Sequence, residues 1–175
     1  MDDVIAVAID KAHAPSVIRA LKTGGISTRI PRSAVESFLK DEFEQIINMN
    51  PISENDYDKW AIGIEKEIVK EYHRNGITDY TLGNAQKLVS MAMKYIFSAD
   101  NVDPDLPVFK VAHIPIDKRI MDIAKSKLGV QKTASSWSKI DDENEIITYQ
   151  KNIRVKMDEM LRGYFPMIWE CENWK

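Results

Sequence analysis

The chain has 175 residues, the length of one domain, and a protein of this size buries about 70% of its unfolded surface without help from a disulfide or a metal. Hydrophobic residues at 44% and charged residues at 29% exclude a generally disordered protein, and a net charge of -3 excludes a surface that is basic all over. Cys171 is the only cysteine, which excludes an intramolecular disulfide and a multi-cysteine zinc site.

The first residues do not resemble a secretory signal. Met1-Asp2-Asp3 is acidic where a signal peptide is basic, and the apolar run at 4–9 is short. No window approaches the roughly 18 apolar residues that span a bilayer. We therefore expect a cytoplasmic protein that does not associate with membranes.

Two short apolar segments come first along the chain. Residues 2–13 have apolar side chains at helical spacing and predict a helix, although the alternation within 4–9 also suits a short strand. A second apolar stripe follows Pro15 and closes at Gly24-Gly25, a typical helix stop.

Two longer helices are then expected. Ser33 and Glu36 have the spacing of a capping box, and the helix that they begin ends at Pro51. Ser53 and Asp56 suggest the start of the next helix, whose apolar residues recur at steps of three or four until Gly76.

The segment 81–98 is apolar around most of its circumference. A helix of this kind is normally central and buried, so we expect it to be the core helix of the domain. Residues 100–107 are predicted to form a loop, and residues 108–112 are expected to be extended. Asp117 is then expected to cap a helix that stops at Gly129.

The last long helix is expected to begin at Ser138 and Asp141, which have capping-box spacing, and to end before Pro166. The elements together predict an all-α fold, a compact single-domain bundle of six or seven helices over residues 1–175 around the helix at about 81–98. A short aromatic tail, 165–175, completes the chain.

The charge balance changes sign between Val108 and Ile140. Seven basic residues against two acidic ones give this stretch a local net charge of +5 in an acidic protein, which can attract an anion. The basic residues are Lys110, Lys118, Arg119, Lys125, Lys127, Lys132 and Lys139, and the acidic ones are Asp117 and Asp122.

His113 and Asp117 are the candidate catalytic pair, because the rigid turn at Pro115 can set an imidazole beside a carboxylate and orient it as a general base. The alternative is structural: Asp117 caps a helix while His113 packs beside it. The three histidines, His13, His73 and His113, lack the spacing of a helical metal site, so no metal is expected.

Four further residues are candidate ligand contacts. Lys87 and Lys94 are seven residues apart on one helix face, about 10 Å along the axis, and can hold a phosphate-rich ligand if that face lines a cleft. Trp137 and Lys139 can stack a base beside its phosphate. The alternatives are a solvated lysine strip and a Trp137 that packs on the first turn of the last helix.

No nucleotide-binding glycine loop and no nucleophile elbow is present, so no cofactor is expected. Neighbouring carboxylates such as Glu65 and Glu67 lie among other charges on a face that is predicted to be exposed, which indicates contact with solvent and not catalysis.

Two hypotheses about function follow from these observations. The first is a non-enzymatic regulatory or protein-interaction protein, in which Trp169 and Trp174 dock a partner or a second copy. The alternative is a protein that recognises phosphate in a nucleotide or single-stranded nucleic acid through the basic 108–140 segment, with catalysis by His113 and Asp117.

Overall fold

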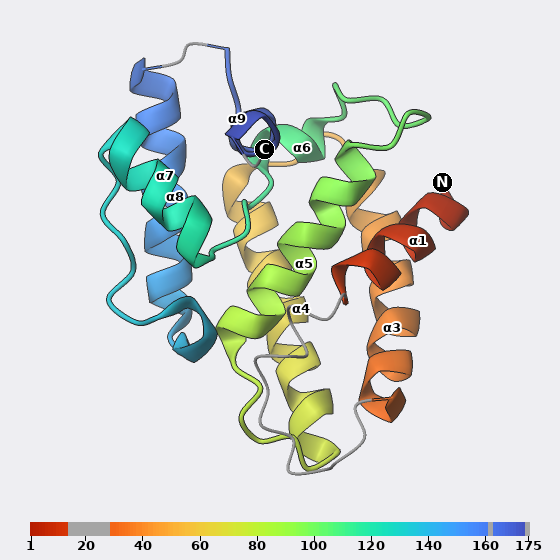
Figure 1. The fold of residues 1–175 in the computed structure, drawn as a ribbon. Coiled ribbons are helices and arrows are strands. Elements are labelled where there is room, and N and C mark those ends of the chain that lie inside the picture. The colour runs from red at the N-terminus through yellow and green to blue at the C-terminus, as the bar shows by residue number, and fades with distance from the viewer. Residues whose placement is uncertain (14–28, 161–162, 174–175) are drawn as a thin grey trace.

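A computed structural model describes residues 1–13, 29–160 and 163–173 of the chain. The fold is all-α: these residues form eight α-helices and one short 3-10 helix, with no strand among them (Figure 1). The helices are α1 Asp2–Ala12, α3 Arg29–Ile47, α4 Glu54–Arg74, α5 Leu82–Phe97, α6 Pro107–Val111, α7 Lys118–Leu128, α8 Glu143–Met160 and α9 Pro166–Asn173, with η1 Trp137–Lys139 before α8.

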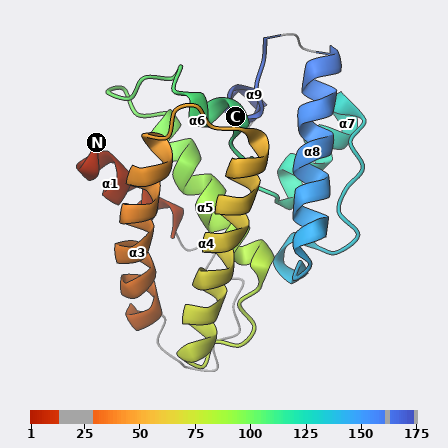
Figure 2. The ribbon, with the colours of Figure 1, turned by 180° about the vertical axis from the view of Figure 1, so that it is seen from behind.

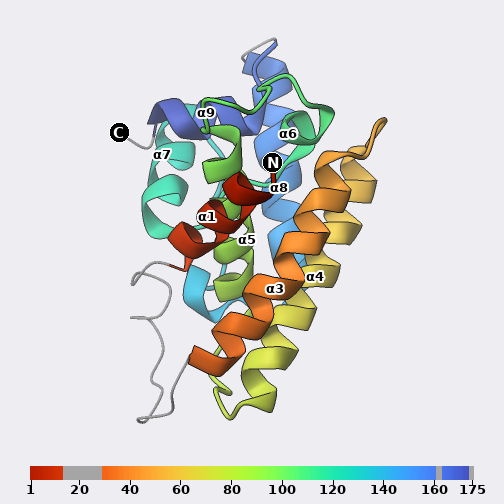
Figure 3. The ribbon, with the colours of Figure 1, turned by 90° about the vertical axis from the view of Figure 1, so that its right-hand side faces the viewer.

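Helix α5 is the centre of the bundle, as its nearly continuous apolar surface predicts. It contacts α1, α4, α9 and η1, and both of its lysines are more than nine-tenths buried. Figure 3 shows α1 crossing α5, with α3 and α4 side by side next to them. Seen from behind, α8 and α7 stand on the other side of α4, away from α3 (Figure 2).

The apolar side chains gather in two clusters. The larger one is built by α1, α3, α4, α5 and α6, with Met167 of α9. The smaller one is built by α7 and α8 with the segment 114–116, and it includes Ile62 of α4, Leu82 of α5 and Trp169. Since the two clusters meet along α4 and α5, polar groups that lie between them hold the two parts of the bundle together.

The segment 112–117 crosses the interior in an extended conformation, although no strand pairs with it. Two amide side chains take the place of a neighbouring strand. Gln86 donates to the carbonyl of Ile114 at 2.9 Å and accepts from the amide of Ile116 at 2.9 Å. Gln150 contacts both backbone groups of Ile114, at 2.8 and 3.2 Å. Buried backbone groups need such partners, so this network fixes the path of the segment.

Several expected helix boundaries are confirmed. Ser53 and Asp56 form a capping box, the Asp117 carboxylate caps α7 at the amide of Ile120, and Gly129 ends α7 with a φ of 71°. Residues 2–13 are largely helical, so the strand alternative at 4–9 is wrong. The expectations for Pro15 to Gly25 lie outside the described residues.

Other boundaries differ. Ser33 lies inside α3, which begins at Arg29, so it caps nothing there. Residues 108–111 belong to α6, with Pro107 in its first turn, and are not extended. Asp141 does not pair with Ser138: its carboxylate accepts from the backbone amide of Leu82 at 3.0 Å and so caps α5, a helix distant in sequence.

Candidate functional site

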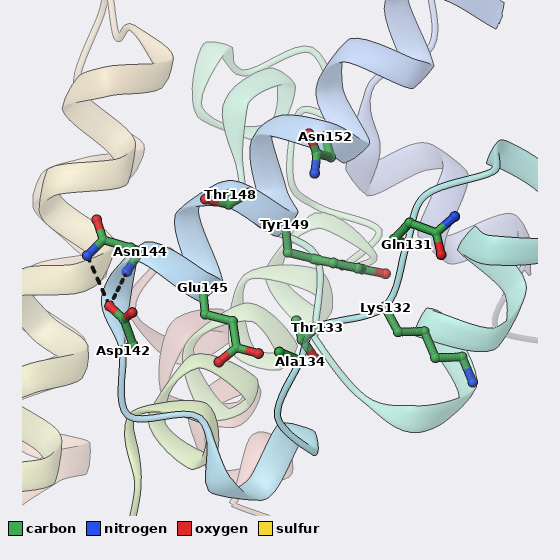
Figure 4. Close-up of a pocket in the computed structure, with 10 residues that line it drawn as sticks. All are labelled: Gln131, Lys132, Thr133, Ala134, Asp142, Asn144, Glu145, Thr148, Tyr149 and Asn152. Carbon is green, nitrogen blue, oxygen red and sulfur yellow. Dashed lines mark hydrogen bonds between the residues drawn. The ribbon is translucent and has the colours of Figure 1, made fainter.

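A polar groove lies between the loop after α7 and the first three turns of α8. Its volume is about 490 Å³, within the range of small-molecule and peptide-binding pockets. Figure 4 shows its ends: Asp142 and Asn144 lie at one, and Gln131 and Lys132 at the other. The lining residues are Gln131, Lys132, Thr133, Ala134, Asp142, Asn144, Glu145, Thr148, Tyr149 and Asn152.

Hydrogen bonds within the groove hold its loop against α8. Glu145 accepts from the backbone amide of Ser135 at 2.6 Å, and the Thr133 hydroxyl donates to the carbonyl of Ser135 at 2.8 Å. Asp142 accepts from the backbone amide of Asn144 at 2.9 Å, which places a carboxylate immediately before the first turn of α8, where the helix dipole favours it. The carboxylates of the groove therefore fix the position of the loop relative to the start of α8.

At the Lys132 end the groove adjoins a basic surface. Helix α7 packs against α8 at the outside of the bundle (Figure 1). Its apolar side chains are largely buried, and its four basic side chains are exposed. Lys132 pairs with Asp122, and the hydrogen bond to Lys132, together with the charges of Lys118 and Lys125, lowers the pKa of Asp122. These lysines therefore lie close enough to act together. We call the group Lys118, Arg119, Lys125, Lys127 and Lys132 the α7 basic surface.

The candidate ligand contacts Lys87 and Trp137 do lie together, with Lys87 buried and Trp137 partly buried. The Lys87 ammonium lies 3.3 Å from the Asp117 carboxylate and 4.5 Å from the centre of the Trp137 ring. Asp117 also caps α7, so one carboxylate serves two partners. The segment 108–140 thus folds against the Lys87 face, and the contact between them is an ion pair with a cation–π interaction.

Lys94 is held in a second buried pair. Its ammonium donates to Glu170 of α9 at 2.8 Å, and burial raises the pKa of Glu170 although Lys94 opposes that shift. Lys139, by contrast, is an exposed residue of η1. The structure therefore brings Lys87, Trp137 and Asp117 together and gives Lys94 a separate carboxylate partner.

His113 does lie beside a carboxylate, but the carboxylate is Asp58 of α4 and not Asp117. His113 Nε2 lies 2.8 Å from Asp58 Oδ1, and the same oxygen accepts from Arg154 of α8 at 2.8 Å. Burial opposes the charge on Asp58, but the hydrogen bonds from His113 and Arg154 lower its pKa to about 2. An ionised carboxylate only accepts, so His113 donates through Nε2.

This buried trio connects the two halves of the bundle. Asp58 comes from α4, Arg154 from α8, and His113 from the extended segment that runs between them. Burial lowers the pKa of His113, although the bond to Asp58 opposes this, so the imidazole is neutral at physiological pH. With His113 only 1% exposed, no reactant reaches either ring nitrogen in this conformation.

The sequence reasoning missed Asp58 and Arg154, and it misplaced Glu65. Glu65 was expected on an exposed face, yet it is fully buried. Asp58, Glu65 and Tyr72 are spaced by seven residues and lie on one stripe of α4, next to the apolar residues that face the core. That spacing was the signal that these carboxylates point inward.

Trp169 belongs to the core of the smaller cluster and is 3% exposed, so it is not presented to a partner in this conformation. Trp174 lies outside the described residues.

In the described ranges, no three His, Cys, Asp or Glu side chains are grouped as metal ligands. No helix of the described chain has the length and apolar character needed to cross a membrane. Comparisons with protein-family models, with curated proteins and with solved structures give no match.

Proposed function

We propose that this chain is a non-enzymatic interaction protein of the cytoplasm that binds an acidic segment of a partner protein. The segment lies along the α7 basic surface and continues into the polar groove beside α8. The observation that carries this proposal is the row of exposed basic side chains on α7 in a protein whose net charge is -3. Such a patch attracts and orients an oppositely charged partner.

The polar groove supports a peptide as the occupant. Amide and hydroxyl groups of Gln131, Asn144, Thr148 and Asn152 line it, and these groups can pair with the backbone of an extended chain. Its charged ends also have opposite sign, with Lys132 at one and Asp142 at the other (Figure 4). A segment with acidic residues at the Lys132 end matches this polarity.

The buried ion pairs support a binding role over a catalytic one. Lys87, Lys94 and His113 each contact a carboxylate inside the bundle, where they contribute to its architecture. His113 was a catalytic candidate, and Lys87 and Lys94 were candidate ligand contacts. Most charged groups at the surface of α7 are basic, three lysines and one arginine beside the single carboxylate of Asp122, and basic groups of this kind serve recognition.

The alternative proposal is recognition of phosphate in a nucleotide or a single nucleic-acid strand, without the catalytic role expected for His113 and Asp117, because both are buried in structural contacts. The same basic surface favours it, since lysines attract phosphates as well as carboxylates. The peptide is preferred because one face of Trp137, the residue expected to stack a base, is covered by the Lys87 ammonium.

Fluorescence anisotropy with a labelled 12-residue glutamate-rich peptide tests the proposal. We expect salt-sensitive binding by the wild-type protein and a loss of affinity of at least about tenfold in the double variant Lys118→Glu, Lys125→Glu. The control is Lys11→Glu, Lys70→Glu, which makes the same change in net charge on exposed residues of α1 and α4. Equal loss in both variants would show a general charge effect and overturn the proposal.

A labelled 12-nucleotide single-stranded DNA serves as the second ligand in the same assay. Tighter binding of the DNA than of the peptide at moderate salt, with the same sensitivity to the α7 substitutions, would favour the phosphate-recognition alternative. Tighter binding of the peptide supports the partner-protein proposal.

A further inference from the structure

A second cleft lies between α4 and α8, apart from the groove described above except for one shared lining residue, Asn144. Its volume is about 340 Å³, which suits a small ligand. Both walls are helix faces, because the α4 residues recur at steps of three or four, as do those of α8 (Figure 2 shows the two helices). The lining residues are Asn55, Asp58, Lys59, Ile62, Gly63, Lys66, Glu143, Asn144, Ile147 and Lys151.

The lining of this cleft has a positive balance. Lys59, Lys66 and Lys151 bring three ammonium groups, against the carboxylates of Asp58 and Glu143. Both carboxylates are already partnered, Glu143 by Lys66 and Asp58 by His113 and Arg154. Lys59 and Lys151 come from opposite walls, so an anion between the helices has a cation on each side.

A buried cation adds to this positive balance. Arg154 follows Lys151 by three residues on α8 and holds Asp58, a lining residue, at 2.8 Å. Arg154 is 4% exposed, and no described residue forms a hydrogen bond with its Nε. Arg154 also lies 3.7 Å from Glu54. The charge on Asp58 is therefore offset from behind by Arg154, as that on Glu143 is by Lys66.

Gly63 is an unusual residue for its position on this wall. It lies in the middle of the 21-residue helix α4, where glycine is less stable than alanine because its unfolded state has more freedom. An added Cβ would meet nothing within 4 Å, so packing inside the protein does not require a glycine here. Gly63 lines the cleft, so the space beside it is open to a ligand that occupies the cleft.

We propose that the α4–α8 cleft is a binding site for a small phosphate-bearing anion. Lys59 and Lys151 contact the phosphate oxygens from the two walls, Asn55 and Asn144 donate from their amides, and Gly63 makes room for the ligand against α4. Lysine binds phosphate as a point charge, and two lysines on facing helices clamp an oxyanion between them. This site is separate from the α7 basic surface and does not depend on it.

Isothermal titration of the full chain with inorganic pyrophosphate at 50 mM NaCl tests the site. The wild-type protein is expected to bind one equivalent, and Lys59→Met, Lys151→Met to bind at least tenfold more weakly. The matched control is Lys118→Met, Lys125→Met on α7, which removes the same charge and is expected to keep the wild-type affinity within twofold.

Gly63 gives a sharper test, since stability and binding should change in opposite directions. Gly63→Ala is expected to raise the melting temperature by about 2–4 °C and to weaken pyrophosphate binding severalfold. Gly63→Leu should abolish binding, with a melting temperature no lower than that of the wild type by more than a few degrees. The proposal is overturned if the wild-type protein does not bind pyrophosphate, if the cleft variants bind it as the wild type does, or if only the α7 variant loses binding.

Discussion

At the scale of single residues, the buried ionisable groups of this protein fall into two kinds. Asp58, Lys87 and Lys94 each have a partner of opposite charge, and removing one member of such a pair leaves an uncompensated buried charge. Glu65 has no hydrogen-bond partner within residues 1–13, 29–160 and 163–173, and both of its oxygens are buried. Burial, with a smaller contribution from the charge of Asp58, raises the pKa of Glu65 well above 4.5.

Glu65 therefore makes stability depend on pH in a defined direction. Above pH 4.5 the unfolded chain loses this proton while the folded protein keeps it, so the free energy of unfolding falls as pH rises toward the raised folded pKa. The slope from this one group is about 1.4 kcal/mol for each pH unit. The variant Glu65→Gln, which cannot ionise, should lack this component.

Urea denaturation of both proteins at pH 5, 6 and 7 measures the effect. The stability of Glu65→Gln relative to the wild type should increase steadily across this series. Glu67→Gln is the control, because that neighbouring side chain is exposed. A difference between Glu65→Gln and the wild type that stays constant from pH 5 to pH 7 would contradict a protonated Glu65.

The residue scale also shows which candidate side chains could be predicted. Asp117 as a cap follows from local sequence, and the structure confirms it, because a cap depends on residues three positions away. The partner of His113 is 55 residues away, and the partner of Lys94 is 76 residues away. Composition and spacing within one segment hold no information about such pairings, so His113 was assigned to the nearest carboxylate in sequence.

At the scale of elements, the N-terminus of α5 is joined to the segment 137–141. Gly83 donates its amide to the carbonyl of Ile140 at 2.8 Å, and Asp141 caps the amide of Leu82. The Thr81 hydroxyl donates to the carbonyl of Ser138 at 3.2 Å. A Cβ on Gly83 would lie 1.8 Å from the backbone oxygen of Trp137, so only glycine permits this contact.

Two glycines in helices should therefore respond to alanine in opposite ways. Gly83→Ala forces two backbones apart and should lower the free energy of unfolding by about 2–4 kcal/mol, because backbone atoms cannot rotate out of the way. Gly63→Ala meets no atom and should raise it by about 0.5–1 kcal/mol. Urea denaturation at pH 7 measures both, and destabilisation of the same size in both variants would contradict this account of the α5 contact.

Helix positions were predicted well where periodicity is long, as for α4 and α5, because an apolar stripe needs several turns to be recognised. The short helix α6 has five residues and gives no periodic signal, so an extended segment was expected there and the helix was missed. Asp141 was assigned to the wrong helix because its position in the sequence, shortly before α8, does not reveal whether its carboxylate caps α8 or another helix.

At the scale of the whole molecule, the basic residues of α5 and those of α7 have different environments. Lys87 and Lys94 on α5 form internal ion pairs with Asp117 and Glu170, whereas the basic residues on α7 are exposed to solvent. The sequence showed the net charge of the segment 108–140, but not which of its residues would be exposed. In the structure the basic residues of this segment are exposed, whereas Asp117 is buried, and this exposure is the basis for the proposed partner-binding role of the α7 basic surface.

The measurement that tests this central claim most directly is a two-dimensional amide NMR titration of the labelled protein with the glutamate-rich peptide. We predict that the signals that shift first come from α7 and from residues 131–134, with smaller changes in the first turns of α8, and that 300 mM NaCl suppresses them. Shifts confined to α1, α3 or the α4–α8 cleft, or no shift at low salt, would contradict the account.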